Sequence, residues 1–180
     1  MLVEEALDTI FGKVMVTIRF NEYAIRLKGS VPRIGSKAPD FTLTKANLVD
    51  ITLEAINARR IILNIFPSID SPACAQSARK FNAAATELDN VYILCISADL
   101  PFAINRFCMG EGLTCVQFLS SFRYPNFGKN YGVKISKGPL SGLLARCVMV
   151  LDENKHVIYS ELVKQLEEEP DYERPLLACN

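Results

Sequence analysis

Short apolar runs alternate with amphipathic stretches along most of the chain, and turn-forming residues separate them. Residues 61–66 (IILNIF) and 91–97 (VYILCIS) are almost continuously apolar, which is typical of strands buried on both faces. Between them, residues 71–88 carry apolar side chains at helical spacing. Similar patterns predict further strands at residues 15–20, 23–27, 41–44, 116–120, 146–151 and 157–160, and further helices at residues 99–109 and 172–179.

The order of these elements predicts the fold class. Strands that alternate with helices indicate an α/β sandwich with helices packed on a central sheet. Asn21-Glu22 predicts an N-terminal β-hairpin, and Glu153-Asn154 predicts a late hairpin that makes the central sheet mixed. We expect one domain over residues 15–180, preceded by an extension over residues 1–14. The start of that extension has apolar residues at helical spacing and fits either a short amphipathic helix or a loose tail.

Composition and charge narrow the function classes. Of the 180 residues, 49% are apolar and 22% are charged, both near the averages of globular proteins. The 20 basic residues balance the 20 acidic ones, so the basic surface that binds nucleic acid is not expected. No apolar run reaches the roughly 18 residues of a membrane helix, and the acidic N-terminal stretch does not resemble a signal peptide. We therefore expect a cytoplasmic protein with no nucleic-acid or membrane partner.

The six cysteines and the single histidine, His156, restrict the chemistry further. There is no Cys-x-x-Cys pair, so neither a zinc site nor a haem site is expected. The sequence GEGLTC does not match a dinucleotide-binding motif, and no other cofactor is indicated. In a reducing compartment the cysteines remain thiols, which favours a catalytic use of cysteine over structural disulfides.

Cys74 is the first candidate for such chemistry. Ser71 is a favoured N-cap residue and Pro72 is favoured at the first helical position, so Cys74 falls in the first helical turn. Free N–H groups at a helix N-terminus stabilise a thiolate. The predicted strand over residues 61–66 ends just before this turn, and sites in open α/β folds gather at the carboxyl ends of strands. The alternative is that Cys74 is only a small buried apolar side chain.

Cys108 and Arg146 are weaker candidates. Cys108 lies at the end of the helix predicted over residues 99–109, where the helix dipole opposes a thiolate; it fits a thiol that attacks later, or a core residue. Arg146 shares strand parity with Val148 and Val150, which places its guanidinium among apolar side chains. A thiolate or an oxyanion would satisfy such a group. The alternative is that Arg146 ends the strand with its head in water.

The segment LNIFPSIDSPACAQSARKF resembles the active-site segment of bacterial thiol peroxidases, the atypical two-cysteine peroxiredoxins. The similarity continues through GSKAPDFTLT, LCISADLPFAINRFC, GPLSGLLARCVMVLDENKHVIYSELV and EEPDYE, so it spans roughly residues 15–178. P-x-x-x-[TS]-x-x-C, a cysteine in the following helix and a distant strand arginine are highly specific in combination. The resemblance implies a thioredoxin-like fold, with a central mixed sheet flanked by helices and an N-terminal β-hairpin.

The resemblance also implies a role for each matching residue. Cys74 matches the peroxidatic cysteine, which attacks the peroxide as a thiolate, and Cys108 matches the resolving cysteine. Arg146 matches the arginine that stabilises this thiolate and polarises the peroxide, and Pro67 matches the proline that shields the pocket. Ser71 stands where the family usually has threonine. Serine keeps the hydroxyl but lacks the methyl group that fixes the rotamer, so we expect activity to survive in a looser site.

The implied activity is reduction of hydrogen peroxide and organic hydroperoxides through a sulfenic acid and an intramolecular disulfide. The family implies thioredoxin as reductant and a homodimer. Since Cys74 and Cys108 fall on different helices, we expect local unwinding of one or both helices when the disulfide forms. Two alternatives remain: a thiol redox sensor without enzymatic turnover, and a catalytically silent partner-binding protein with the same fold. The other cysteines are expected to be structural, with the penultimate Cys179 mobile.

Overall fold

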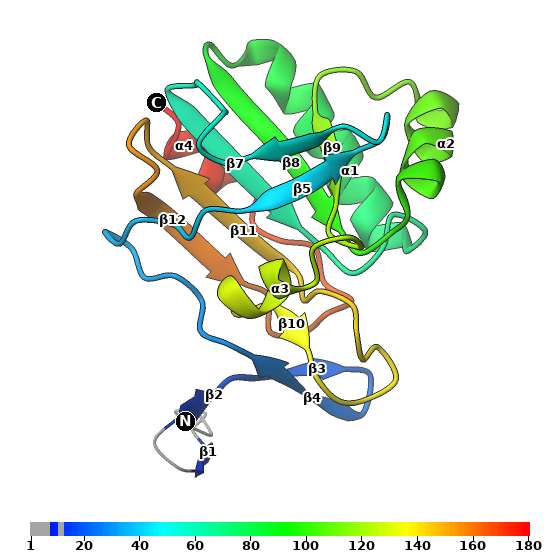
Figure 1. The fold of residues 1–180 in the computed structure, drawn as a ribbon, viewed down its shortest axis with the longest axis vertical. Coiled ribbons are helices and arrows are strands. Elements are labelled where there is room, and N and C mark those ends of the chain that lie inside the picture. Colours follow the sequence, from blue (N-terminus) through cyan, green and yellow to red (C-terminus); the bar gives the residue numbers. More distant parts are fainter. Residues whose placement is uncertain (1–7, 11–12) are drawn as a thin grey trace.

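A mixed seven-stranded sheet forms the centre of the computed structural model, which describes residues 8–10 and 13–180 (Figure 1). The strand order is β12-β11-β7-β8-β9-β5-β6. The parallel strands β7, β8 and β9 occupy the middle of the sheet, and the strands on either side of them run antiparallel. The strands of this sheet are β5 (Thr42–Lys45), β6 (Asp50–Thr52), β7 (Arg60–Ile65), β8 (Val91–Ser97), β9 (Gln117–Ser120), β11 (Cys147–Leu151) and β12 (Val157–Leu162).

Two hydrophobic cores cover the two faces of this sheet. One face packs against α1 (Pro72–Ala84), α2 (Pro101–Glu111) and α4 (Glu173–Leu177). The other face packs against α3 (Asn126–Asn130) and a three-stranded sheet of order β10-β4-β3. Its strands are β3 (Thr17–Phe20), β4 (Tyr23–Lys28) and β10 (Lys134–Ile135). No helix in the described ranges is long and apolar enough to cross a membrane.

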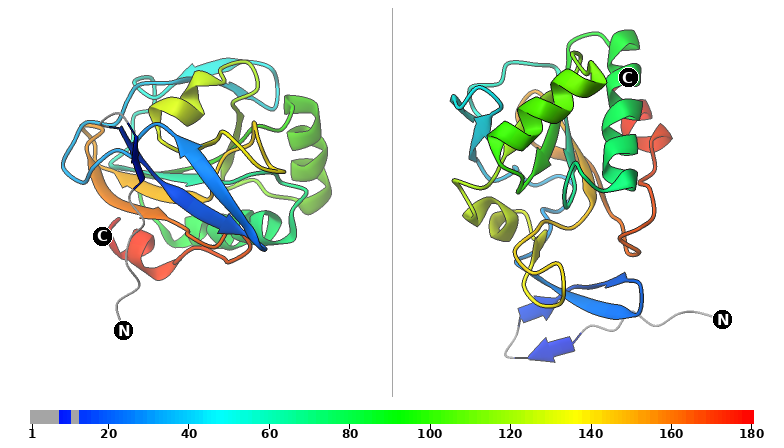
Figure 2. Two further views of the ribbon diagram at one scale, coloured as in Figure 1. Left: turned by 90° about the horizontal axis from the view of Figure 1, so that it is seen from below. Right: turned by 90° about the vertical axis from the view of Figure 1, so that its right-hand side faces the viewer.

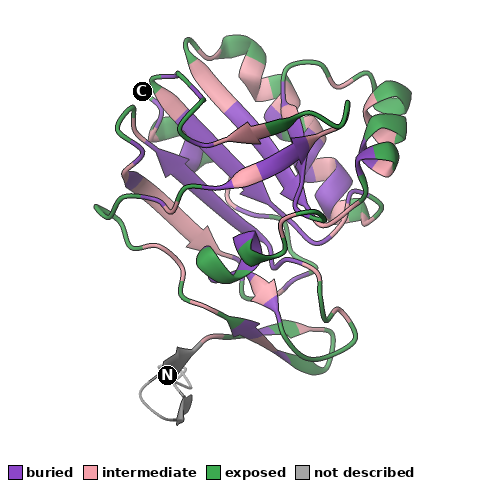
Figure 3. Ribbon diagram, viewed as in Figure 1, coloured by how far each residue is buried: buried purple, intermediate pink, exposed green. Residues whose placement is uncertain are grey.

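Burial on both faces confirms the interpretation of the apolar runs (Figure 3). Along β7, Ile61 and Leu63 point into the core shared with α3, whereas Ile62 points into the core shared with α1 and α2. The side chains therefore alternate between two dry interfaces, which explains why the run has no polar alternation. Asn64 is the buried polar exception; its amide contacts Ser77 and Cys95.

The predicted fold class is confirmed, with small differences at the element ends. The β3–β4 hairpin turns at Asn21-Glu22 and the β11–β12 pair is antiparallel, as expected. The helix predicted from residue 71 is α1, continued by a short 3-10 segment, Ala85–Glu87. The segments β6, α3 and β10 were not predicted; they contain five residues or fewer and have little internal pattern.

The N-terminal extension differs from expectation where it is described. The strands β1 (Asp8–Ile10) and β2 (Lys13–Met15) form an antiparallel pair, so a helix across these residues was wrong. The rest of the expected helix or loose tail, residues 1–7 and 11–12, lies outside the described residues. Because Met15 belongs to β2, the strand predicted over residues 15–20 begins later, at Thr17.

The β3–β4 hairpin is attached to the segment that follows β12. The Arg19 N–H donates to the Lys164 carbonyl at 2.7 Å, and the Leu166 N–H donates to the Arg19 carbonyl at 2.9 Å. Seen from below in Figure 2, the hairpin lies across the end of the central sheet. This docking brings Phe20 and Leu166 beside the carboxyl end of β7, where α1 begins.

Candidate active site

Cys74 lies where the sequence places it, in the first turn of α1. Ser71 has an extended backbone at the N-cap position and Pro72 is the first helical residue. Within the described residues the Ser71 hydroxyl makes no cap hydrogen bond; instead it donates to Cys74 Sγ at 3.0 Å. The Cys74 N–H donates to the Ser71 carbonyl at 3.1 Å. The Ser71 hydroxyl therefore binds the Cys74 sulfur, whereas the Ser71 carbonyl binds the backbone of the first helical turn.

Arg146 reaches the same sulfur from the neighbouring strand. It directly precedes β11 and lies on the same sheet face as Val148 and Val150, as strand parity predicts. Its Nη2 donates to Cys74 Sγ at 3.4 Å and to the Leu166 carbonyl at 3.2 Å. Only 1% of its surface is exposed, so the alternative that its head lies in water is wrong.

Two nitrogen atoms of this guanidinium are left without a partner. Among the described residues, neither Nε nor Nη1 of Arg146 has a hydrogen-bond acceptor, although both atoms are buried. Unpartnered buried donors are costly. They leave Arg146 able to bind an oxygen-bearing ligand while it still contacts Cys74.

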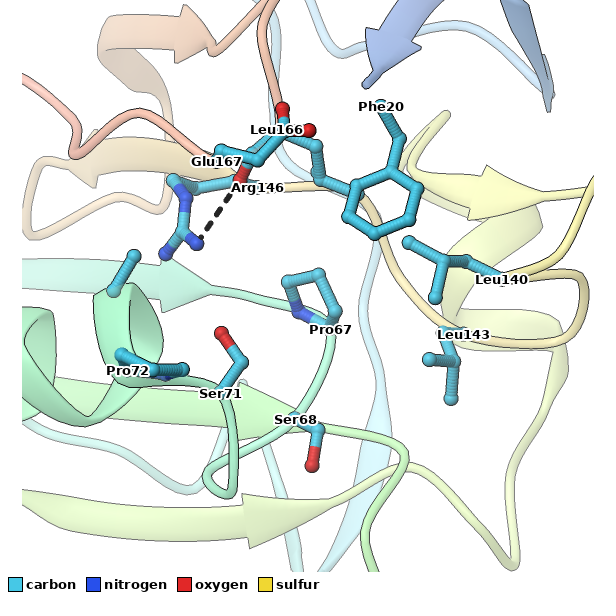
Figure 4. Close-up of a pocket in the computed structure, with 11 residues that line it drawn as sticks. Phe20, Pro67, Ser68, Ser71, Pro72, Leu140, Leu143, Arg146, Leu166 and Glu167 are labelled. Carbon is cyan, nitrogen blue, oxygen red and sulfur yellow. Dashed lines mark hydrogen bonds between the residues drawn. The ribbon is translucent and has the colours of Figure 1, made fainter. Parts of the chain in front are cut away.

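A pocket of about 480 Å³ opens above these residues (Figure 4). The Arg146 guanidinium points toward the start of α1, with Ser71 and Pro67 facing it. Pro67 thus lies in the pocket wall, beside the residues that contact the sulfur. The remaining wall is mostly apolar and comes from distant segments: Phe20, Leu140, Leu143 and Leu166.

Cys108 lies in the last turn of α2 and, like the fully buried Cys74, is not among the residues that line this pocket. It is half-buried and packs against the same core as Cys74, together with Phe107. Burial raises the pKa of the Cys108 thiol to about 11. All six cysteines are free, so the structure represents the fully reduced chain. Cys108 is therefore a protonated, poorly nucleophilic thiol in this state.

The other cysteines differ in their surroundings. Cys95 and Cys147 are buried in strands, and burial raises the pKa of the Cys95 thiol to about 12. Cys115 is exposed. The expectation that Cys179 is mobile was wrong: its side chain is fully buried, and its thiol donates to the Pro175 carbonyl at 3.2 Å. Arg59 also binds the Cys179 carbonyl, which fixes the end of the chain.

Sequence reasoning missed several residues of the site. Leu166 supplies the carbonyl that orients Arg146, and Phe20 closes the pocket, yet neither residue has a local pattern that marks it. Asp99 binds the loop before α1 through its carboxylate. Its position two residues after the buried parallel strand β8 was a usable signal for a residue at this edge of the sheet.

The chain is similar to several known proteins. The Redoxin family model matches residues 33–176. A thiol peroxidase from Corynebacterium glutamicum is 43% identical over 166 residues, which cover 92% of this chain and 100% of that protein. The crystal structure of a peroxiredoxin-like protein from Aquifex aeolicus superimposes with a TM-score of 0.85 at 31% identity, covering 91% of this chain and 95% of that one. A thiol peroxidase from Chromobacterium violaceum has a TM-score of 0.82 at 24% identity, with 88% and 91% covered.

Proposed function

The chain belongs to the redoxin family, and we propose that Cys74 and Cys108 perform a two-cysteine peroxidase cycle in it. Its activity is thiol-dependent reduction of peroxides, with a peroxide as substrate and a reductant of the thioredoxin type. The observation that carries the assignment of Cys74 is the pair of donors on its sulfur, the Ser71 hydroxyl at 3.0 Å and Arg146 Nη2 at 3.4 Å.

In the first step, the Cys74 thiolate attacks the terminal oxygen of the hydroperoxide. The sulfur–oxygen bond forms as the O–O bond breaks, so Cys74 is oxidised to a sulfenic acid and the peroxide is reduced to an alkoxide that takes up a proton. Ser71 and Arg146 stabilise the anionic sulfur, since charge-assisted hydrogen bonds are stronger than neutral ones. The unpartnered Nε and Nη1 of Arg146 are suited to the oxygen on which negative charge develops.

In the second step, Cys108 attacks the Cys74 sulfenic acid. A disulfide forms and water leaves, which protects Cys74 from a second peroxide and from irreversible oxidation. In the closed structure the Cys108 thiol has a pKa of about 11 because it is buried, so few molecules carry the required thiolate. Local unwinding of α2 would expose Cys108 and return it to ordinary thiol acidity. This agrees with the prediction that one or both helices unwind.

The apolar pocket wall supports organic hydroperoxides as substrates beside hydrogen peroxide, because Phe20, Leu140 and Leu143 offer contacts to an alkyl group. Thioredoxin as the reductant of the disulfide, a homodimer and a cytoplasmic location complete the proposal. Exposed Phe102 and Phe122, beside a hollow at the start of α2, support a homodimer because such patches mark interfaces.

The test is peroxide turnover by the reduced protein with thioredoxin and thioredoxin reductase. Cys74→Ser should abolish turnover, and Cys108→Ser should react once with peroxide but cycle poorly. Cys115→Ser, at an exposed thiol outside the site, is the control and should behave as the wild type. Turnover that survives Cys74→Ser would refute the assignment. A single oxidation of the wild type without turnover, at any thioredoxin concentration, would favour the redox sensor.

A further inference from the structure

The Asp99 carboxylate accepts three hydrogen bonds at the edge of the candidate active site. Its Oδ1 accepts from the Ser68 hydroxyl at 2.8 Å. Its Oδ2 accepts from the Ile69 N–H at 2.9 Å and from the Ser97 hydroxyl at 2.7 Å. Ser68 and Ile69 belong to the loop that joins β7 to α1, so one carboxylate fastens the segment between Pro67 and Ser71.

Asp99 is itself held firmly by the central sheet. Its N–H donates to the Ser97 hydroxyl at 3.3 Å, and its carbonyl accepts from the Ser120 hydroxyl at 2.5 Å. Ser97 and Ser120 are the paired last residues of the parallel strands β8 and β9. The carboxylate is therefore an anchor fixed to the end of the central sheet, and its bonds to Ser68 and Ile69 tie the loop before α1 to that sheet.

The same residue leads directly into the helix that carries Cys108. Leu100 is the N-cap of α2 and Pro101 its first residue, so Asp99 joins the two segments on which the two cysteines lie. Other direct links join these segments as well. Arg79 of α1 forms a two-bond ion pair at 2.8 Å with Glu111, the last residue of α2. At the loop before α1, Arg106 and Asp70 approach only to 3.9 Å with 75% and 68% of their side chains exposed, a geometry that contributes little.

We propose that Asp99 is a positioning residue that holds the loop before α1 closed during peroxide attack and must release it before Cys74 reaches Cys108. This inference rests on the proposed two-cysteine cycle. In the closed state, the bonds from Ser68 and Ile69 fix the loop that presents Ser71 and Pro67 to the peroxide. In the open state, those groups turn to water. Weakening the anchor therefore favours the open state over the closed one.

Loss of the anchor should affect the two chemical steps in opposite directions. Peroxide attack requires the closed loop, so its rate should fall. Disulfide formation requires opening, so its rate should rise, and less sulfenic acid should remain for a second peroxide. Hydrogen bonds to a charged acceptor are each worth about a tenfold change in an equilibrium or more. We expect Asp99→Ala to react with peroxide roughly tenfold more slowly and to need several-fold more peroxide for over-oxidation of Cys74.

Asp99→Asn is the graded variant. The asparagine carbonyl can still accept from Ile69 and Ser97, and its amide can donate to the Ser68 oxygen, but without charge. Its effects should have the same signs as those of Asp99→Ala and be smaller. Asp152→Ala is the matched control, because Asp152 Oδ1 also accepts backbone N–H bonds in a turn, from Asn154 and His156, far from the site.

The experiment mixes pre-reduced protein rapidly with peroxide and follows the first oxidation, then measures sulfinic acid on Cys74 by mass spectrometry across a range of peroxide concentrations. A slower first oxidation with greater resistance to over-oxidation in both Asp99 variants, and neither change in Asp152→Ala, supports the proposal. Wild-type values for both steps would overturn it. A fall in both rates together would assign Asp99 a merely structural role and overturn it as well.

Failure of the proposed function would look different. If the wild type forms no disulfide between Cys74 and Cys108 after one equivalent of peroxide, the two-cysteine cycle itself is refuted. If the wild type forms that disulfide normally, and the Asp99 variants show the wild-type ratio of disulfide formation to over-oxidation of Cys74, only the role of Asp99 is refuted.

Discussion

Replacing Arg146 with methionine should remove most of the peroxidase activity and leave the fold at least as stable as the wild type. The guanidinium is 1% exposed and its Nη2 lies 3.4 Å from Cys74 Sγ. At an effective dielectric constant near 20, opposite unit charges at 3.4 Å attract by about 5 kcal/mol, which is an upper limit for the lost contribution. Removal of a single preorganised donor usually lowers a rate by about 100- to 1000-fold, and we expect a loss of that size.

The effect on stability should have the opposite sign. Within the described residues, Nε and Nη1 of Arg146 are buried and unpartnered, so the guanidinium is incompletely compensated for the loss of water. Methionine replaces the stem of the side chain with a flexible apolar one, and the Cys74 sulfur left behind can be a neutral thiol. Replacement of buried ionic groups by apolar ones of similar volume is often neutral or stabilises by about 1–4 kcal/mol.

Two measurements on the reduced protein check this prediction. Rapid mixing with peroxide gives the rate of the first oxidation, and urea unfolding under reducing conditions gives the free energy of unfolding. Arg146→Lys is the control: it keeps a positive charge but loses the forked geometry, so it should retain part of the rate without a gain in stability. A methionine variant within about threefold of the wild-type rate would refute a chemical role for Arg146, since loss of a preorganised donor costs far more. A variant less stable by more than about 2 kcal/mol would instead make the guanidinium a net structural contributor.

Three further predictions follow from contacts of the site and of the cysteines. Ser71→Ala should slow peroxide attack by about tenfold or more, because the Ser71 hydroxyl binds the Cys74 sulfur. Since that hydroxyl does not cap the helix, the free energy of unfolding should fall by less than the usual cap loss of about 1 kcal/mol. Ser71→Thr should restore the rate. The rate of disulfide formation should rise with pH and level off near the ordinary thiol pKa of about 9, because the proposed cycle exposes Cys108 before it attacks. A plateau at the buried pKa of about 11 would indicate attack from an intact α2. Burial raises the pKa of Cys95 from about 9 to about 12, so its contribution to stability is complete below pH 9 and is lost as the pH rises toward 12. As the pH rises toward 12, the free energy of unfolding measured with urea should fall more steeply in the wild type than in Cys95→Ala. The difference in slope should be about 1.4 kcal/mol per pH unit.

The part of the site built from local rules could be predicted from the sequence. Ser71, Pro72 and Cys74 fall within four residues, and the preferences of a helix N-terminus fix their relative positions. Arg146 follows from strand parity, because side chains alternate strictly along a strand and Val148 marks the buried face. In both cases the backbone of one element determines the direction of the side chain.

The rest depends on contacts between segments far apart in the chain. Phe20 reaches the pocket because the β3–β4 hairpin docks beside Leu166, and no pattern in either segment specifies the other. Helix α2 begins at Pro101 and not at the predicted residue 99, because proline occupies the first helical position and Leu100 before it is extended; this local signal was not used in the prediction. Helix α3 was missed because Gly128, in its middle, is a poor helix former. A Cβ there would lie 2.7 Å from Leu144 Cδ2, so a larger residue would have to displace that side chain.

The polar groups around Cys74 share one physical property. Each makes a polar contact with the sulfur, or with the loop before α1, in place of a contact within its own element. Ser71 occupies the N-cap but gives its hydroxyl to Cys74 Sγ. Arg146 is buried at the start of a strand with two nitrogen atoms unpartnered in the described part of the chain. Such an arrangement is stable only where the surroundings hold it in place. Here β7, β8 and β11 are buried on both faces directly beneath the site, and their apolar cores supply that support. The thiol chemistry therefore depends on the same continuous apolar strands from which the fold was predicted.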